Sequence, residues 1–182
     1  VLAKELRSYH DMIRLGRRNP GKVNESDELV PADLSIPVMV EKAVAGSDVV
    51  YLVVGLDYKL DIWQDKWPKL MRATIDACIK HKARLVFFDN VYMYDINAIH
   101  HMTEESPINP PSKKGLVRRQ VAKMVIDDAK SGRLMALIDR SADCYGSGNE
   151  TSFVNELVYK KIKKRKHSNW FFKDPYKPSL TF

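Results

Sequence analysis

The sequence has little cysteine, no long apolar run and no secretory leader pattern. Its two cysteines, Cys78 and Cys144, have neither the paired spacing of a zinc site nor the number needed for a disulfide framework. No run of eighteen or more apolar residues is present, so we expect no transmembrane helix and no membrane partner. The start of the chain lacks the basic, apolar and small-residue regions of a signal peptide. These absences predict a protein of the reducing cytoplasm.

The composition is that of one globular domain with a substantial core. The chain has 182 residues, 45% of them hydrophobic and 29% charged, with a net charge of +7. Six of the seven residues 160–166 are basic. Such a run can be a solvated helix end, where cations suit the helix dipole, or a phosphate-binding patch. Because no helix-turn-helix pattern or aromatic platform accompanies it, we interpret it as a helix end and expect no nucleic-acid partner.

Strand-like and helix-like segments alternate along the chain. We predict strands at residues 12–15, 49–54, 85–88 and 134–138, and helices at 37–45, 64–82, 112–130 and 152–164. This alternation predicts an α/β fold of the Rossmann type, a parallel sheet with helices on both faces. The runs at 49–54, 85–88 and 134–138 are continuously apolar, so we expect them to be neighbouring strands at the centre of the sheet. A loop of about twenty residues follows 85–88, and loops of that length are usually functional.

Two of the predicted helices carry recognisable end signals or faces. Asp61 followed by Gln64 resembles a capping box. The helix at 112–130 has apolar residues at helical spacing, which we expect to form its buried face: Leu116, Val117, Val121, Met124, Val125 and Ala129.

Five segments, in chain order, resemble the extended and atypical short-chain dehydrogenase/reductases, the group that contains the NAD-dependent epimerase/dehydratases. They are IRLGRRNPGKV, PADLSIPVMVEKAVAGSDVVYLVVG, LVFFDNVYMYD, SPINPPSKKG and DRSADCYGSG. The resemblance implies an incomplete NAD(P)-binding Rossmann domain at residues 1–150 and the start of a C-terminal substrate-binding region at 151–182. It also implies a homodimer, because such proteins often pair through long helices such as 64–82.

The best signature of that family is absent. Its glycine-rich turn binds the pyrophosphate with backbone N–H groups at a helix N-terminus, and here it would lie before Val1. The first segment, VLAKELRSYH, reads like the last turns of a helix, and no strand precedes it in the sequence. We therefore expect the sequence to be a piece of a longer one.

The resemblance also assigns candidate cofactor-binding residues. Arg17 and Arg18 follow the family's second strand, where NAD-binding members have an acidic residue. Arginine suits the extra phosphate of NADP, so we expect NADP as the cofactor, with NAD as the alternative; solvated loop arginines are the other interpretation. Asp33 and Leu34 correspond to the adenine contact, although Asp33 is equally an ordinary residue before a helix.

Three residues at the end of the predicted strand 49–54 complete the cofactor set. Val53, Val54 and Gly55 occupy the position at which small family residues let the cofactor approach closely. A plain buried strand end is the competing interpretation.

The candidate catalytic residues lack the expected tyrosine. Lys113 corresponds to the lysine of the family's Tyr-x-x-x-Lys pair, which should share one helix face with the tyrosine. Asn109 stands four residues earlier, and an amide cannot act as a general acid or base near neutral pH. Asn90 corresponds to the family's serine or threonine and could hydrogen-bond a substrate. Asp89 could be a base or a solvated carboxylate, and Tyr92 could replace the lost acid or serve packing.

The resemblance assigns substrate contacts to Asn90, Ser141, Asp143 and Tyr145. A metal is not expected, because the adjacent His100 and His101 do not have metal-ligand spacing.

Two functions fit these residues. The first is an NADP-dependent reductase or epimerase-like enzyme that acts on a small carbonyl or sugar compound. The second is a binding module that senses NADP and has lost the chemistry. The missing tyrosine favours the second, whereas Lys113 and the Asp89–Asn90 pair support the first. We expect little ordinary carbonyl-reductase activity.

Overall fold

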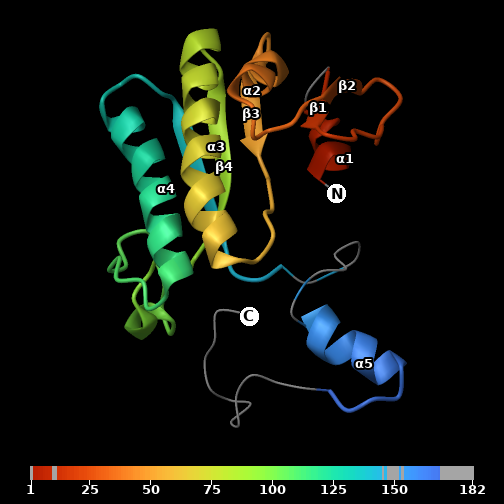
Figure 1. The fold of residues 1–182 in the computed structure, drawn as a ribbon, viewed down its shortest axis with the longest axis vertical. Coiled ribbons are helices and arrows are strands. Elements are labelled where there is room, and N and C mark those ends of the chain that lie inside the picture. The colour runs from red at the N-terminus through yellow and green to blue at the C-terminus, as the bar shows by residue number, and fades with distance from the viewer. Residues whose placement is uncertain (1, 10–11, 145, 147–151, 153, 169–182) are drawn as a thin grey trace.

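Parallel strands alternate with helices in the computed structural model, which describes residues 2–9, 12–144, 146, 152 and 154–168 (Figure 1). The strands are β1 (Arg14–Arg17), β2 (Glu28–Pro31), β3 (Val49–Leu52), β4 (Arg84–Asn90) and β5 (Ala136–Ser141). The helices are α1 (Leu2–Leu6), α2 (Pro37–Val44), α3 (Leu60–His81), the 3₁₀ turn η1 (Ile96–Ala98), α4 (Lys113–Lys130), the π-helix η2 (Asn155–Tyr159) and α5 (Lys160–Lys163). The predicted α/β class is confirmed.

The three apolar strands form one parallel sheet in the order β3-β4-β5. Leu85 of β4 pairs with Val50 of β3 on one side and with Ala136 of β5 on the other. The prediction that these strands are parallel neighbours is confirmed. Parallel order follows because α3 and α4 each carry the chain back before the next strand begins.

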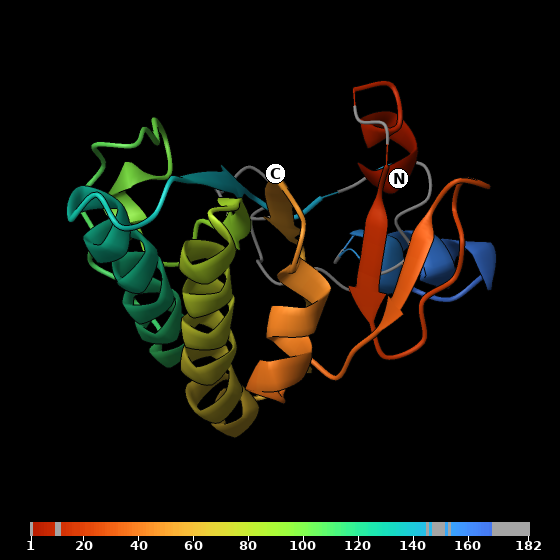
Figure 2. The same cartoon turned by 90° about the horizontal axis from the view of Figure 1, so that it is seen from above.

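A second, two-stranded parallel sheet joins β1 and β2. Strand β1 begins at Arg14, two residues after the predicted start at Met12, and β2 was not predicted at all. Within the described residues, β1 is paired only with β2, and β3 only with β4. The sheet is therefore in two parts, which α2 connects in the chain (Figure 2).

The described helices that pack on the apolar strands share one face of the three-stranded sheet. Helices α2, α3 and α4 lie on the same side of the three-stranded sheet (Figure 2). On that side, Leu85 and Phe87 of β4 are fully buried. On the other side, Phe88 is 38% exposed and Leu137 is 61% exposed. Only alternate residues of each apolar run are therefore enclosed, as the two-residue period of a strand dictates.

Helix α3 supplies the largest part of the core. Trp63, Trp67, Met71 and Ile75 recur at helical spacing and are buried. Cys78 is buried on the same face, and burial raises the pKa of its thiol to about 12. The two long helices are joined by an ion pair in which an Arg72 nitrogen lies 2.8 Å from Asp128 Oδ2.

The ends and faces of two helices differ from the prediction. Helix α3 begins at Leu60, and its N-cap Lys59 makes no side-chain capping bond, so the capping box at Asp61 is wrong. Helix α4 is capped by Ser112, whose hydroxyl accepts from the Gly115 N–H at 3.0 Å. On α4, Leu116 is 48% exposed while Arg118 is buried. The buried face of α4 therefore includes the charged residue Arg118 and excludes the predicted Leu116.

The predicted helix at 152–164 is shorter in the structure. Its described part is mainly η2 and the single turn α5, and Ile162 is exposed there. The basic residues after α5 are also exposed, as expected of a helix end. Among the described residues, none of the helices combines the length and apolar character needed to cross a bilayer.

Candidate functional site

The candidate site lies where the carboxyl ends of β3, β4 and β5 meet. Because these strands are parallel, the loops that follow them and the start of α4 lie at one edge of the sheet (Figure 1). Asn90 at the end of β4 pairs in register with Ser141 of β5, so two of the sequence-predicted substrate residues lie opposite one another. In open α/β sheets, ligands bind outside this edge.

A buried ion pair between Arg118 of α4 and Asp89 of β4 lies next to this edge. Nε of Arg118 donates to Oδ1 of Asp89 at 2.7 Å, and a second guanidinium nitrogen contacts the same oxygen. The Asp89 side chain is 0% exposed. The Arg118 guanidinium lies 4.2 Å from the ring centre of Trp67 and 5.0 Å from that of Phe87. Desolvation lowers the pKa of Arg118, and the charge of Asp89 opposes that shift.

Arg140 connects this ion pair to the loop after β4. One of its terminal nitrogens donates to the Tyr94 hydroxyl at 3.1 Å, and its Nε lies 3.7 Å from Asp89 Oδ2. Tyr94 is 4% exposed. The buried ring and its bond to Arg140 give Tyr94 a packing role.

The Asn90 amide shapes the turn that leaves β4. Its Oδ1 accepts from the Tyr92 N–H at 3.0 Å, and the Asn90 N–H donates to Asp89 Oδ1 at 2.8 Å. Asp89 and Asn90 therefore hold the backbone from which Tyr92 projects.

Tyr92 lies under the start of α4. Burial raises the pKa of its hydroxyl above the ordinary value, as do a hydrogen bond with the Tyr58 side chain and the charge of Asp143; Arg118 acts in the opposite direction. Gly115 permits this packing, because a Cβ there would overlap the Tyr92 carbonyl oxygen and lie 2.7 Å from Pro110 Cβ. The first turn of α4 therefore rests directly on the Tyr92 backbone.

The two lysines at the start of α4 have different surroundings. Lys114 Nζ lies 3.1 Å from the ring centre of Tyr58 and donates to the Tyr58 carbonyl oxygen at 2.9 Å. Lys113 is exposed and lines a shallow groove between α3 and α4, beside Gln64 and Gln120. Lys114 is thus the lysine that the structure places against a tyrosine at the strand ends.

The expected helical spacing between Asn109 and Lys113 is wrong. Helix α4 begins at Lys113, so Asn109 precedes the helix and the two residues do not share a helix face. Pro110 and Pro111 explain this, because proline lacks the N–H that a helix interior requires. Asn109 is exposed and donates to Asp95 Oδ2 at 2.8 Å.

The candidate residues for the adenosine end of a cofactor lie together on the two-stranded sheet. Arg18 follows β1, Asp33 follows β2, and Arg18 Nε lies 3.1 Å from Asp33 Oδ2. Hydrogen bonds from the Ser35 hydroxyl and N–H, and then from Arg18, lower the pKa of Asp33 from 3.8 to about 2. Arg17 is exposed, and Leu34 packs against the core.

The end of β3 is open. Val53 is 55% exposed, whereas Val54 packs against the core. A Cβ added to Gly55 would meet nothing within 4 Å. This segment has room beside it for a ligand along its backbone.

The remaining substrate candidates follow β5. The Ser141 hydroxyl donates to the Ala142 carbonyl oxygen at 3.0 Å and lies 3.5 Å from Cys144 Sγ. Asp143 is close enough to influence the pKa of Tyr92. Tyr145 lies outside the described residues.

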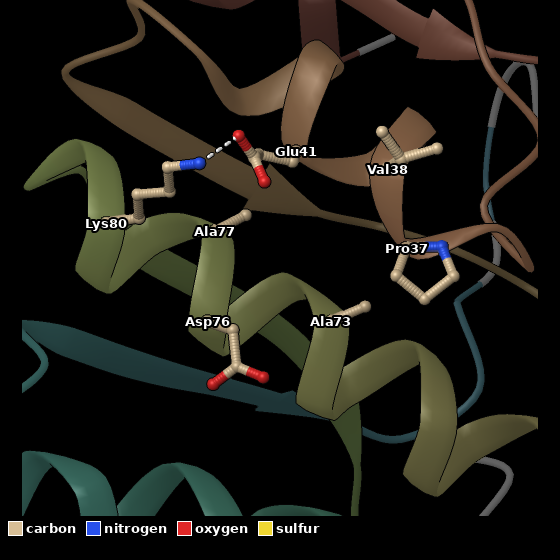
Figure 3. Close-up of a pocket in the computed structure, with 7 residues that line it drawn as sticks. All are labelled: Pro37, Val38, Glu41, Ala73, Asp76, Ala77 and Lys80. Carbon is tan, nitrogen blue, oxygen red and sulfur yellow. Dashed lines mark hydrogen bonds and ion pairs between the residues drawn. The ribbon is translucent and has the colours of Figure 1, made fainter.

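A separate groove lies between α2 and α3, away from the strand ends (Figure 3). The small residues Ala73 and Ala77 form its floor, and an ion pair between Glu41 and Lys80 closes one end. It contains none of the predicted site residues. In the described part of the chain, no three His, Cys, Asp or Glu side chains are grouped to hold a metal ion.

Three residues of the edge were not found from the sequence: Tyr58, Lys114 and Arg118. Tyr58 lies in the loop after β3, 56 positions before Lys114, and only the packing of α4 brings them together. Pro110 and Pro111 were the signal in the sequence that α4 begins only after them, because residues before a proline disfavour the helical conformation.

The fold is shared with several solved structures of sugar-nucleotide and uronate enzymes. UDP-galactose 4-epimerase superposes with a TM-score of 0.74 at 18% identity, over 92% of this chain and 60% of that one. MoeE5, solved with UDP-glucose and NAD, gives 0.70 at 18% identity, over 90% and 57%. A mutant uronate dehydrogenase from Agrobacterium tumefaciens, solved with NAD, gives 0.66 at 18% identity, over 80% and 58%.

The chain spans less than two thirds of the length of each of these structures. No protein-family model and no curated protein sequence matches it. The chain therefore has the Rossmann-type fold of the NAD-dependent epimerase/dehydratase structures.

Proposed function

We propose that this chain binds a nicotinamide dinucleotide and acts, in the manner of an epimerase/dehydratase, on a sugar-type or other small carbonyl compound. The observation that carries the proposal is the contact between Arg18 and Asp33. The sequence assigns both residues, from separate segments, to the adenosine end of the cofactor, and they lie 3.1 Å apart.

The chemistry of these residues fits the group. A guanidinium binds phosphate through charge-assisted hydrogen bonds, and a carboxylate accepts hydrogen bonds from ribose hydroxyls. The open space beside Gly55 would leave room for the middle of the dinucleotide, and Asn90, Lys113 and Lys114 would then be the residues to attend its nicotinamide end. A bound nicotinamide supplies or accepts a hydride; the protein positions the substrate and manages the proton.

NADP is the cofactor that Arg17 and Arg18 favour. Arg17 is exposed, and the Arg18 side chain is 71% exposed, so both can reach a phosphate on the ribose. The ion pair with Asp33 competes for Arg18, and the same carboxylate suits the free hydroxyls of NAD. The preference between NADP and NAD therefore depends on whether Arg18 stays paired with Asp33 or pairs with the phosphate on the ribose.

Titration calorimetry with NADPH and NADH tests this function. We expect tighter binding of NADPH, and a loss of at least about tenfold in NADPH affinity on Arg17→Ala plus Arg18→Ala, because a hydrogen bond to a charged group contributes about 1.5–3 kcal/mol. Arg119→Ala, an exposed arginine of α4, is the matched control. Equal affinity for the two nucleotides contradicts the NADP preference, and the absence of binding contradicts the function.

A second function, an NADP-binding sensor without chemistry, is supported by Asn109. The amide stands where the family places its tyrosine and is bonded to Asp95. Nucleotide binding without turnover of any carbonyl or sugar-nucleotide substrate supports this alternative.

A further inference from the structure

The loop after β3 brings a tyrosine to the carboxyl edge of the sheet. Tyr58 is 57% exposed, and its ring meets Trp63 edge-on at 5.4 Å between ring centres. Trp63 is buried and stacks in turn against Trp67. The contacts with Trp63 and Trp67 therefore fix the position of the exposed Tyr58 ring near the strand ends.

Tyr92 reaches the same phenol from the loop after β4. The two side chains are hydrogen-bonded, and this bond is one of the causes that raise the pKa of Tyr92. Tyr92 is itself fixed by the Asn90 amide and by the first turn of α4 over Gly115. Of these two hydrogen-bonded tyrosines, Tyr58 is the exposed one.

Lys114 places a cation against the same ring. Its Nζ lies 3.1 Å from the Tyr58 ring centre and 5.7 Å from that of Trp63, and its bond to the Tyr58 carbonyl oxygen fixes it there. Partial burial lowers the pKa of Lys114. A positive charge beside the ring stabilises the negative charge that develops on the phenol oxygen during proton transfer.

From this geometry, and resting on the proposed function, we infer that the Tyr58 hydroxyl is the proton donor to the substrate oxygen at this site, with Tyr92 and Lys114 as positioning residues. Tyr58 takes the role of the family's tyrosine, at whose position in the sequence this chain has Asn109. The ligand class is a compound whose carbonyl or hydroxyl oxygen lies within hydrogen-bond reach of Tyr58.

The proton transfer balances in the direction of reduction. The Tyr58 O–H bond breaks and an O–H bond forms on the carbonyl oxygen, while the carbonyl carbon accepts a hydride from a reduced nicotinamide dinucleotide, the reductant of the proposed function. The phenolate left on Tyr58 accepts the Tyr92 hydrogen bond, and water restores its proton. In the direction of oxidation, the Tyr58 oxygen accepts the proton instead.

The test compares Tyr58→Phe, Tyr92→Phe and Lys114→Met with the unaltered chain. Turnover is measured with NADPH and glyceraldehyde, and with NAD and UDP-glucose, and nucleotide affinity is measured separately by calorimetry. We expect Tyr58→Phe to lower kcat by on the order of 10²–10⁴-fold with unchanged nucleotide affinity, as loss of a general acid does. The positioning variants should lower kcat less. Tyr9→Phe and Lys123→Met, both exposed, are the matched controls.

Two further readouts separate this role from a structural one. Incorporation of 3-fluorotyrosine at position 58, whose hydroxyl is more acidic, should shift the pH profile of kcat to lower pH. The ultraviolet titration of Tyr92, which faces Tyr58, Asp143 and Arg118, should move to lower pH in Tyr58→Phe, because the hydrogen bond that retains its proton is lost.

Each outcome decides between the claims. Nucleotide binding with no turnover by the unaltered chain, or turnover that Tyr58→Phe leaves intact, overturns the role of Tyr58 and leaves the nucleotide-binding function standing. Absence of nucleotide binding by the unaltered chain contradicts the proposed function itself.

Discussion

Arg118 and Asp89 form an enclosed ion pair beneath the carboxyl edge of the sheet, with Nε 2.7 Å from Oδ1 and both side chains buried. The pair joins α4 to the end of β4 and fixes the backbone that leads to Asn90 and Tyr92. The Asp89 carboxylate is enclosed and paired with Arg118, so we propose that it supports the site rather than acting as a base.

Removing one partner of this pair should destabilise the fold. Arg118→Met leaves the Asp89 carboxylate buried without its cation, and we expect a loss of about 3–5 kcal/mol in the free energy of unfolding. Urea denaturation followed by circular dichroism measures it. Arg119→Met, one position along α4 and exposed, should change the value by less than about 0.5 kcal/mol. Equal effects of the two substitutions would contradict the burial of the pair.

Gly115→Ala should disturb the contact between α4 and Tyr92. The added Cβ would overlap the Tyr92 carbonyl oxygen, so the helix start or the loop must shift. We expect a loss of about 1–3 kcal/mol in stability, typical of overpacking, with altered Tyr92 resonances in the NMR spectrum. Gly21→Ala is the control, because its Cβ would meet nothing within 4 Å. An unchanged stability in Gly115→Ala would show that α4 does not rest on this backbone.

Asn109→Tyr should not restore a tyrosine–lysine pair. Asn109 precedes α4, whereas the sequence reasoning placed it one helical turn before Lys113. We expect no gain in NADPH-dependent turnover in steady-state assays of the variant. A large gain would indicate that the segment before α4 can rearrange into a helical turn, contrary to the structure.

Asp33 should make part of the stability dependent on acid pH. Its pKa is lowered in the folded chain from 3.8 to about 2, so its ionised form is favoured by folding. The resulting stability is fully present above pH 3.8 and is lost as the pH falls toward about 2. Asp33→Asn should be less stable than the unaltered chain at pH 6, and the difference should shrink below pH 3. A constant difference at both pH values would contradict the lowered pKa.

The central strands were predictable because their residues are unambiguous. Runs rich in Val, Leu, Ile and Phe between helices of regular spacing specify parallel strands, and β3, β4 and β5 pair as expected. Strand β2 was missed because its four residues, ELVP, include a glutamate and a proline that read as a loop.

The details of the site depended on tertiary packing. A charged residue on a helix is normally assigned to solvent, so Arg118 was not foreseen as a core residue; it is buried because Asp89 lies at the matching point of β4. Lys114 and Tyr58 meet only because α4 packs beside the loop after β3. Sequence spacing carries no information on such contacts. Arg18 and Asp33 were assigned from the family resemblance, and they lie 3.1 Å apart in the structure; their role in cofactor binding stays a prediction.

The binding of a nicotinamide dinucleotide at the carboxyl edge is the central claim, and nitrogen-15 NMR with NADPH tests it most directly. Even weak, millimolar binding, worth about −4 kcal/mol, shifts the amide resonances of contacting residues. We predict that the shifts gather on Arg17, Arg18, Asp33 and residues 53–55, with Tyr9 and Lys123 unaffected. Shifts confined to the groove between α2 and α3, or no shifts at all, would contradict the account.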